Sequence, residues 1–163
     1  MYFYRVILAV ILCFSFTQQS FANCYKAEEA EAEQGIRIHS ELMVIGLNCS
    51  HLADANGNNL YLEHKKFTKK HETLFARYEK TMIEHMRKNG TKNPEKSMHL
   101  LRTKFANKIS SDVAAMRPDI FCKSFASRIE QVSKMDEQTF RNWAATPFPE
   151  YPVSKPLCEE KSE

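Results

Sequence analysis

The sequence predicts an all-α protein: an up-down-up-down four-helix bundle with a short fifth helix, an extended Pro-rich C-terminal tail and two disulfides. Glycine accounts for only 4 of the 163 residues, which is typical of a chain with few turns. Long segments repeat apolar residues at helical spacing, and short connections separate them. The length suits one domain. We place it at residues 23–145 and the tail at 146–163, where Cys158 staples the tail to the bundle.

The first 22 residues have the pattern of a secretory signal peptide. Arg5 precedes an apolar run from Val6 to Phe16, and Ser20-Phe21-Ala22 places small residues at both recognition positions before the cleavage point. The apolar run is too short for a membrane span, which needs about 20 residues. We therefore expect cleavage after Ala22, a periplasmic or secreted protein, and no transmembrane segment in the mature chain.

Two long helices are expected in the first half of the mature chain. The first covers 27–47, where Ile38, Leu42 and Ile45 share one helical face and several glutamates crowd the positive end of the helix dipole. A polar connection over 48–59 separates it from a second helix over 60–88. Asn89-Gly90 then supplies the residues that commonly end a helix.

Three further helices are expected before the tail. Pro94 suits the first turn of a third helix, whose apolar stripe runs to Met116. Arg117-Pro118-Asp119 breaks this helix, and apolar residues from Cys122 to Val132 mark a fourth. Asp136 can cap a short fifth helix, which Pro147 ends.

The cysteine positions predict the disulfide pairing. Cys13 lies in the signal peptide, so Cys24, Cys49, Cys122 and Cys158 remain for an oxidising compartment. A continuous first helix would hold Cys24 and Cys49 about 37 Å apart, whereas a disulfide needs about 4.4 to 6.8 Å between Cα atoms. Up-down topology places Cys49 and Cys122 at one pole and the other two at the opposite pole. We therefore expect Cys49–Cys122 and Cys24–Cys158.

Three histidines of the second helix are weak candidates for a metal site. His64, His71 and His85 are seven or fourteen residues apart, and a spacing of seven separates side chains by about 10.5 Å along a helix. One ion prefers ligands at i and i+4, so a site would need a histidine from another helix, such as His39 or His99. We expect partly exposed histidines at the helix seam instead, and no bound metal or other cofactor.

Four lysines of the second helix form a candidate surface-binding row. Lys65, Lys66, Lys69 and Lys70 could contact anionic lipid or polysaccharide, although a solvated face that balances the acidic first helix is the simpler interpretation. The net charge of the whole chain is only +3. That charge argues against a nucleic-acid binder, which needs many phosphate contacts.

Four stretches of the chain carry a resemblance to a known family. They are Cys24-Tyr25, residues 41–49, residues 117–122 and residues 143–149. These stretches resemble an uncharacterised family of small exported cysteine-containing helical proteins of Gram-negative bacteria. The resemblance implies a periplasmic location and carries over no activity and no site residue.

The function expected from the sequence is that of an exported, non-enzymatic protein that binds another envelope or periplasmic protein or the envelope surface. No catalytic signature supports an enzyme, since a Gly-x-Ser-x-Gly motif and a free cysteine in the mature chain are both missing. The alternative is a periplasmic carrier that binds a small ligand, a metal or haem through the histidines of the second helix. A covalent haem would need Cys-x-x-Cys-His, which the sequence lacks.

Overall fold

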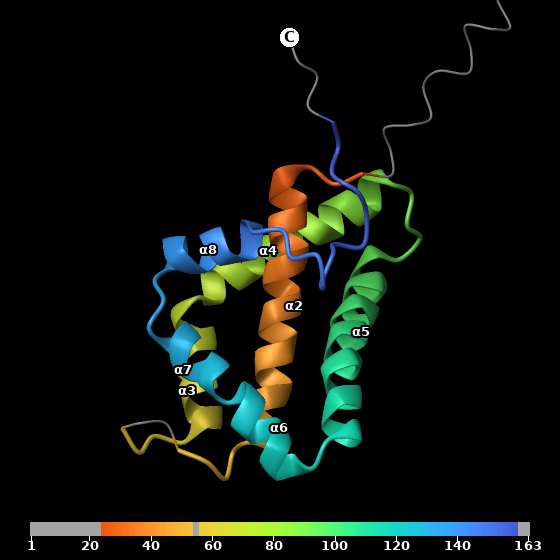
Figure 1. Ribbon diagram of the computed structural model, residues 1–163. Coiled ribbons are helices and arrows are strands. Elements are labelled where there is room, and N and C mark those ends of the chain that lie inside the picture. The colour runs from red at the N-terminus through yellow and green to blue at the C-terminus, as the bar shows by residue number, and fades with distance from the viewer. Residues whose placement is uncertain (1–23, 54–55, 160–163) are drawn as a thin grey trace, which may run out of the picture.

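The computed structural model describes residues 24–53 and 56–159, and the predicted signal peptide lies outside this part of the chain. The described chain is mostly helical (Figure 1). Its helices are α2 (Ala27–Asn48), α3 (Leu60–Lys70), α4 (Glu72–Lys88), α5 (Pro94–Ala115), α6 (Pro118–Phe125), α7 (Ser127–Ser133) and α8 (Glu137–Ala145). None of these helices is long and apolar enough to cross a membrane.

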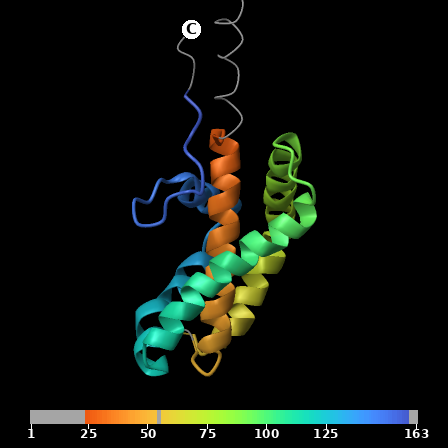
Figure 2. The same ribbon diagram turned by 90° about the vertical axis from the view of Figure 1, so that its right-hand side faces the viewer.

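Helix α2 is the centre of the fold. It contacts every other described helix, and Figures 1 and 2 show α4, α5 and α8 arranged around it. Most of its residues are buried, including the charged Glu33, Arg37 and Glu41. Helix α4 packs closely against it at Gly35, because a Cβ atom there would collide with the Tyr78 ring. Such a central rod differs from a bundle in which four helices each bury one stripe, so a regular up-down-up-down bundle is not confirmed.

The helix predicted over 60–88 is in fact two helices that meet at His71. The backbone of His71 leaves helical geometry, with φ −109° and ψ 21°. Its ring packs against Phe67 and Phe140, at centroid distances of 4.8 and 6.2 Å, and its Nε2 lies 3.3 Å from the carbonyl oxygen of Met135. Contacts with residues far away in the sequence therefore fix this bend. No glycine or proline in the sequence indicates it.

The predicted fourth helix is also divided and begins earlier than expected. Pro118 starts α6, as a proline in the first turn of a helix can. Helix α7 follows after Ala126 and ends at Ser133. The apolar stripe from Cys122 to Val132 therefore belongs to two short helices. Each has its own contact with the rest of the fold, since α7 packs mainly on α3 and α6 reaches α2 and α5.

The two disulfides join the pairs expected from the sequence. Cys49 and Cys122, with Cα atoms 5.6 Å apart, are 0% and 1% exposed. Cys24 and Cys158, with Cα atoms 4.9 Å apart, are only half-buried. Because α2 is unbroken, it holds Cys24 and Cys49 at opposite poles of the molecule.

The described part of the tail contains no helix and returns to the start of α2, but it is not extended throughout. It turns at residues 148–151, where the Tyr151 N–H donates to the Phe148 carbonyl at 2.9 Å. The Tyr25 N–H donates to the Pro156 carbonyl at 2.7 Å, and the Cys158 N–H donates to the Tyr25 carbonyl at 2.8 Å. These two bonds form an isolated parallel bridge between Tyr25 and Leu157. The tail thereby covers the first turns of α2 beside the end of α8 (Figure 1).

Candidate functional site

The tail leaves a hollow of about 420 Å³ between itself and two helices. We call this hollow the tail groove. Its lining comes from the first turns of α2 (between Ala27 and Gln34), the end of α8 (Ala144 and Ala145) and tail residues between Thr146 and Leu157. Most of these lining residues are alanine, proline or larger apolar residues. Several, including Ala27, Ala145 and Pro147, are exposed, so the hollow is open to solvent.

Residue size and backbone chemistry explain why this hollow exists. Alanines at the start of α2 and the end of α8 leave space that larger side chains would fill. Pro147, Pro149 and Pro152 keep the facing segment out of a helix, because proline fixes φ and has no N–H to donate within a helix. The segment turns at residues 148–151 instead and forms one wall of the hollow.

Two of the polar residues in the lining already form hydrogen bonds with other residues of the protein. The Arg141 guanidinium donates to both carboxylate oxygens of Glu31, at 2.7 and 3.1 Å, and the Tyr78 hydroxyl donates to Glu31 at 2.7 Å. Burial opposes ionisation of Glu31, but these hydrogen bonds outweigh it and hold its pKa below the ordinary value. Gln34 Nε2 donates to the Tyr151 carbonyl at 2.9 Å. Both residues therefore shape the groove and are not available to a ligand.

Glu28 differs from these residues. It lines the groove and is exposed, and its side-chain carboxylate makes no hydrogen bond or ion pair with the described part of the chain. The rim of an otherwise apolar hollow thus carries one negative charge that the described residues do not neutralise.

A buried carboxylate holds the tail in place. Glu33, which is 2% exposed, accepts hydrogen bonds from the Tyr25 hydroxyl at 2.6 Å and from the Ser154 N–H at 2.6 Å. The Ser154 hydroxyl donates to the same carboxylate. Burial, followed by the bond to Glu33, raises the pKa of the Tyr25 phenol, so Tyr25 keeps the proton that it donates. A buried charge with several donors is a strong restraint, because removing the donors leaves the charge unpaired.

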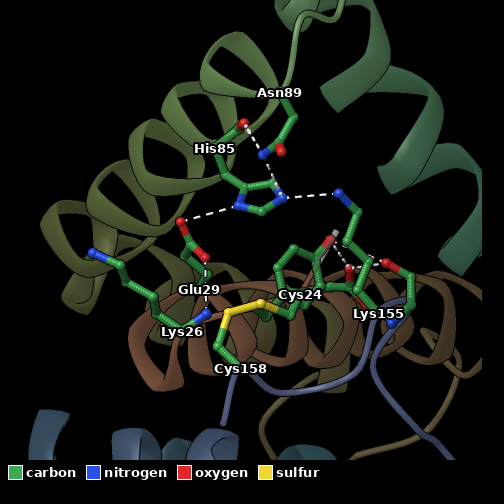
Figure 3. Close-up of polar contacts among 10 residues, drawn as sticks. Cys24, Lys26, Glu29, His85, Asn89, Lys155 and Cys158 are labelled. Carbon is green, nitrogen blue, oxygen red and sulfur yellow. Dashed lines mark hydrogen bonds and ion pairs between the residues drawn. A yellow bond between two sulfur atoms is a disulfide. The ribbon is translucent and has the colours of Figure 1, made fainter. Parts of the chain in front are cut away.

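A histidine adds a second restraint on the tail, shown in Figure 3. His85 Nδ1 lies 3.0 Å from Glu29 Oε1, and its Nε2 lies 2.9 Å from Lys155 Nζ. The Cys24–Cys158 disulfide lies close to this line of side chains. We refer to Glu29, Glu33, His85, Ser154, Lys155 and this disulfide as the tail clamp.

Glu29, His85 and Lys155 are residue types that can form a proton-transfer chain, but their geometry argues against that role. His85 is 5% exposed, and each of its nitrogens already faces a charged group. A general base needs a free nitrogen within reach of a substrate proton. The arrangement therefore fits a fixed structural contact between α2, α4 and the tail.

The structure does not bring the three predicted histidines together. His64 faces His39 and Thr68, His71 lies at the junction of α3 and α4, and His85 belongs to the tail clamp. They are 5%, 4% and 5% exposed, so the prediction of partly exposed histidines is wrong. Their aromatic and hydrogen-bonded neighbours account for the burial. In residues 24–53 and 56–159, no group of three or more His, Cys, Asp or Glu side chains could hold a metal ion.

The predicted basic row lies on α3 and is partly neutralised. Lys66 and Lys69 donate to glutamates three residues away, Glu63 and Glu72, at 2.7 and 2.6 Å. Lys70 donates to a backbone carbonyl at 2.8 Å. Lys65 lies 5.9 Å from the centre of the Tyr61 ring. The four lysines are exposed, but only Lys65 is without a hydrogen bond or ion pair in the described chain.

Sequence reasoning did not identify the tail groove or the tail clamp. A signal for the groove is present in the alanines at the start of α2 and the prolines after Thr146. No such signal exists for Glu33, whose donors Tyr25 and Ser154 are 8 and 121 residues away. Only the fold shows that this glutamate is buried.

Comparisons of the chain with protein-family models, with curated proteins and with solved structures found no match. The geometry of the tail groove and the tail clamp is therefore the basis for inferring a function.

Proposed function

We propose that the protein is an exported, non-enzymatic binding protein of the periplasm or the extracellular space, whose tail groove receives apolar side chains of a partner protein. One observation carries the proposal: an open hollow of about 420 Å³ has apolar walls and a cover that is covalently and electrostatically fixed. Binding sites are commonly preformed, mostly apolar hollows of about 300 to 1,000 Å³. Two disulfides support an oxidising compartment, because cytosolic thiols are kept reduced.

The charge at the rim of the tail groove indicates which kind of partner would bind there. The Glu28 carboxylate has no side-chain partner in the described chain, so it favours a ligand with a positive charge beside its apolar part. Leu157, which also lines the groove, is 53% exposed and adds to its apolar surface. A segment that carries bulky apolar residues next to a lysine or arginine fits both features.

The volume of the groove also suits a small cationic amphiphile, which is the second candidate ligand. A competition experiment separates the two. A neutral fluorescent probe, N-phenyl-1-naphthylamine, reports occupancy, and two peptides of equal length compete with it: one has bulky apolar residues beside lysine, and the other has glutamate in place of lysine. We expect the basic peptide to displace the probe at lower concentration than the acidic peptide. Displacement by a cationic amphiphile and by neither peptide would support the second candidate.

Two matched pairs of variants show whether binding occurs in the groove. Ala145→Trp fills the groove, whereas Ala76→Trp places the same side chain at an exposed position of α4. Glu28→Gln removes the charge at the rim, whereas Glu130→Gln removes a charge on α7. We expect the first of each pair to weaken binding of the basic peptide and the second to have no effect. Equal binding by Ala145→Trp and Ala76→Trp would contradict the proposal.

A further inference from the structure

A second hollow, of about 340 Å³, lies between α2 and α3, on residues that the tail groove does not use. His39 and Met43 of α2 and His64 and Thr68 of α3 are among the residues that line it. His39 and Met43 are four residues apart, which places them on the same face of α2. His64 and Thr68 have the same spacing on α3. Four side chains that carry donor atoms therefore line one hollow.

The two imidazole rings meet at one hydroxyl group. His39 Nε2 lies 3.1 Å and His64 Nε2 lies 3.4 Å from Thr68 Oγ1. The rings are stacked, with centroids 5.5 Å apart and an angle of 23° between their planes. The hydroxyl can donate its proton to one of the two nitrogens and accept a proton from the other. Because both Nε2 atoms lie within 3.4 Å of this one oxygen, they share one small region of space.

The ring contacts and hydrogen bonds of this pair leave one buried nitrogen to explain. His39 also stacks on Phe75, with centroids 4.3 Å apart. His64 is 5% exposed, and although the His39 backbone lies close to its ring, the buried Nδ1 makes no hydrogen bond of good geometry within the described chain. Buried polar groups without a partner are uncommon in native proteins and call for an explanation.

The charges around the hollow select the kind of ion. His39, Met43 and His64 offer nitrogen and sulfur donor atoms and no carboxylate. Lys65 and Lys69 line the same hollow, and its glutamate, Glu72, already pairs with Lys69 at 2.6 Å. A divalent ion would find no free carboxylate to balance its charge. Imidazole and thioether ligands suit soft ions such as Cu(I).

We propose that His39, Met43 and His64 form a site for a soft monovalent metal ion of the Cu(I) or Ag(I) type. Each imidazole would supply one nitrogen, and the Met43 thioether would supply the sulfur. Met43 is 38% exposed, so the ion can enter from solvent. The site uses one of the three histidines suggested by the sequence and takes its second histidine from another helix.

The test uses the exported protein with both disulfides intact, in chloride-free buffer, and Ag(I) as a redox-inert probe. Cys13→Ser is included in every sample if the N-terminal segment is retained, because a free thiol binds Ag(I). We expect one equivalent of Ag(I) to shift the side-chain NMR signals of His39 and His64 and to leave those of His51 and His99 unchanged. Zn(II) at the same concentration should leave all four unchanged. Ag(I) shifts that spare His39 and His64, or equal shifts with Zn(II), would overturn the proposal.

Two matched pairs of variants identify the ligands. Met43 and Met116 are both 38% exposed, so Met43→Leu and Met116→Leu change the packing to a similar degree. We expect Met43→Leu to weaken Cu(I) affinity about tenfold or more, measured anaerobically against bicinchoninate, and Met116→Leu to have no effect. His39→Gln should abolish binding, whereas His99→Gln, at an exposed position of α5, should not. Unchanged affinity in either Met43→Leu or His39→Gln would overturn the three-ligand site.

Discussion

The two poles of the molecule contain the same covalent bond in opposite surroundings. At the pole of Cys49 and Cys122 both cysteines are fully buried, and Phe121 beside them is 0% exposed. At the pole of Cys24 and Cys158 the cysteines are half-buried, and the surrounding tail clamp is polar and charged. The first bridge belongs to the core. The second fixes a tail segment over a groove, so its role depends on electrostatics and on access.

The largest expected effect comes from removing the buried bridge. The double variant Cys49→Ala/Cys122→Ala should have a lower free energy of unfolding. The chain-entropy model gives a loss of about 4 kcal/mol for a loop of this length. The space left by two buried side chains should lower the stability further. Urea unfolding followed by circular dichroism measures the loss. Loop entropy alone predicts a larger loss for Cys24→Ala/Cys158→Ala, whose bridge spans 134 residues instead of 73. If Cys24→Ala/Cys158→Ala were the less stable of the two variants, the burial of the disulfides would not explain the difference between the two poles.

A loss of about 3 kcal/mol is expected from Glu33→Ala, because the change leaves the buried Tyr25 hydroxyl and the part-buried Ser154 N–H without their acceptor. The matched control is Glu72→Ala, which removes a carboxylate that is 59% exposed and paired with Lys69. Exposed pairs of this kind contribute under about 1 kcal/mol. Urea unfolding of both variants makes the comparison, and equal losses would mean that the tail clamp does not restrain the fold.

Acid should destabilise the protein in two separate pH windows. The unfolded chain binds a proton at His39 near pH 6.5, whereas the folded chain resists protonation until about pH 4, so stability falls as the pH is lowered through this range. Glu31 has a lowered pKa in the folded state, so its contribution is present above pH 4.5 and is lost only at lower pH. His39→Gln should reduce the first decline by roughly 3 kcal/mol and leave the second. Urea midpoints between pH 7 and pH 3 test this, and an unchanged first decline would contradict it.

The smallest expected effect is that of Lys155→Met, which removes the contact with His85 Nε2 and retains an apolar side chain of similar length. Because Lys155 is only half-buried, we expect a loss of about 1 kcal/mol or less. Hydrogen exchange should nevertheless accelerate for the Tyr25 and Cys158 amides, which join the tail to α2. Unchanged exchange at these amides would mean that the remaining contacts hold the tail without Lys155.

Local sequence signals predicted the elements of the fold better than their arrangement. The start of α5 at Pro94 and the cap of α8 by Asp136 follow from local chemistry. The disulfide pairing followed from the length of one unbroken helix. The bend at His71 could not be predicted, because side chains of α3 and α8 and the Met135 carbonyl produce it.

The candidate sites were less accessible to sequence reasoning than the helices. His64 was identified as a potential ligand, and Thr68 follows it by one turn of α3, but the contact of both with His39 depends on how α2 packs against α3. The burial of Glu33 depends on a tail segment 121 residues away. A charged residue at the start of a helix is more often exposed than buried. Long-range packing, which no local pattern contains, therefore determines both sites.

The central claim is that a fixed tail forms the binding groove, and selective reduction tests it most directly. Mild reductant should open the half-buried Cys24–Cys158 bridge before the buried Cys49–Cys122 bridge, as mass spectrometry after alkylation can establish. We expect affinity for the basic apolar peptide to fall about tenfold or more, or ~1.4 kcal/mol, with little change in helix content. Undiminished affinity after the first bridge alone is opened would contradict the claim.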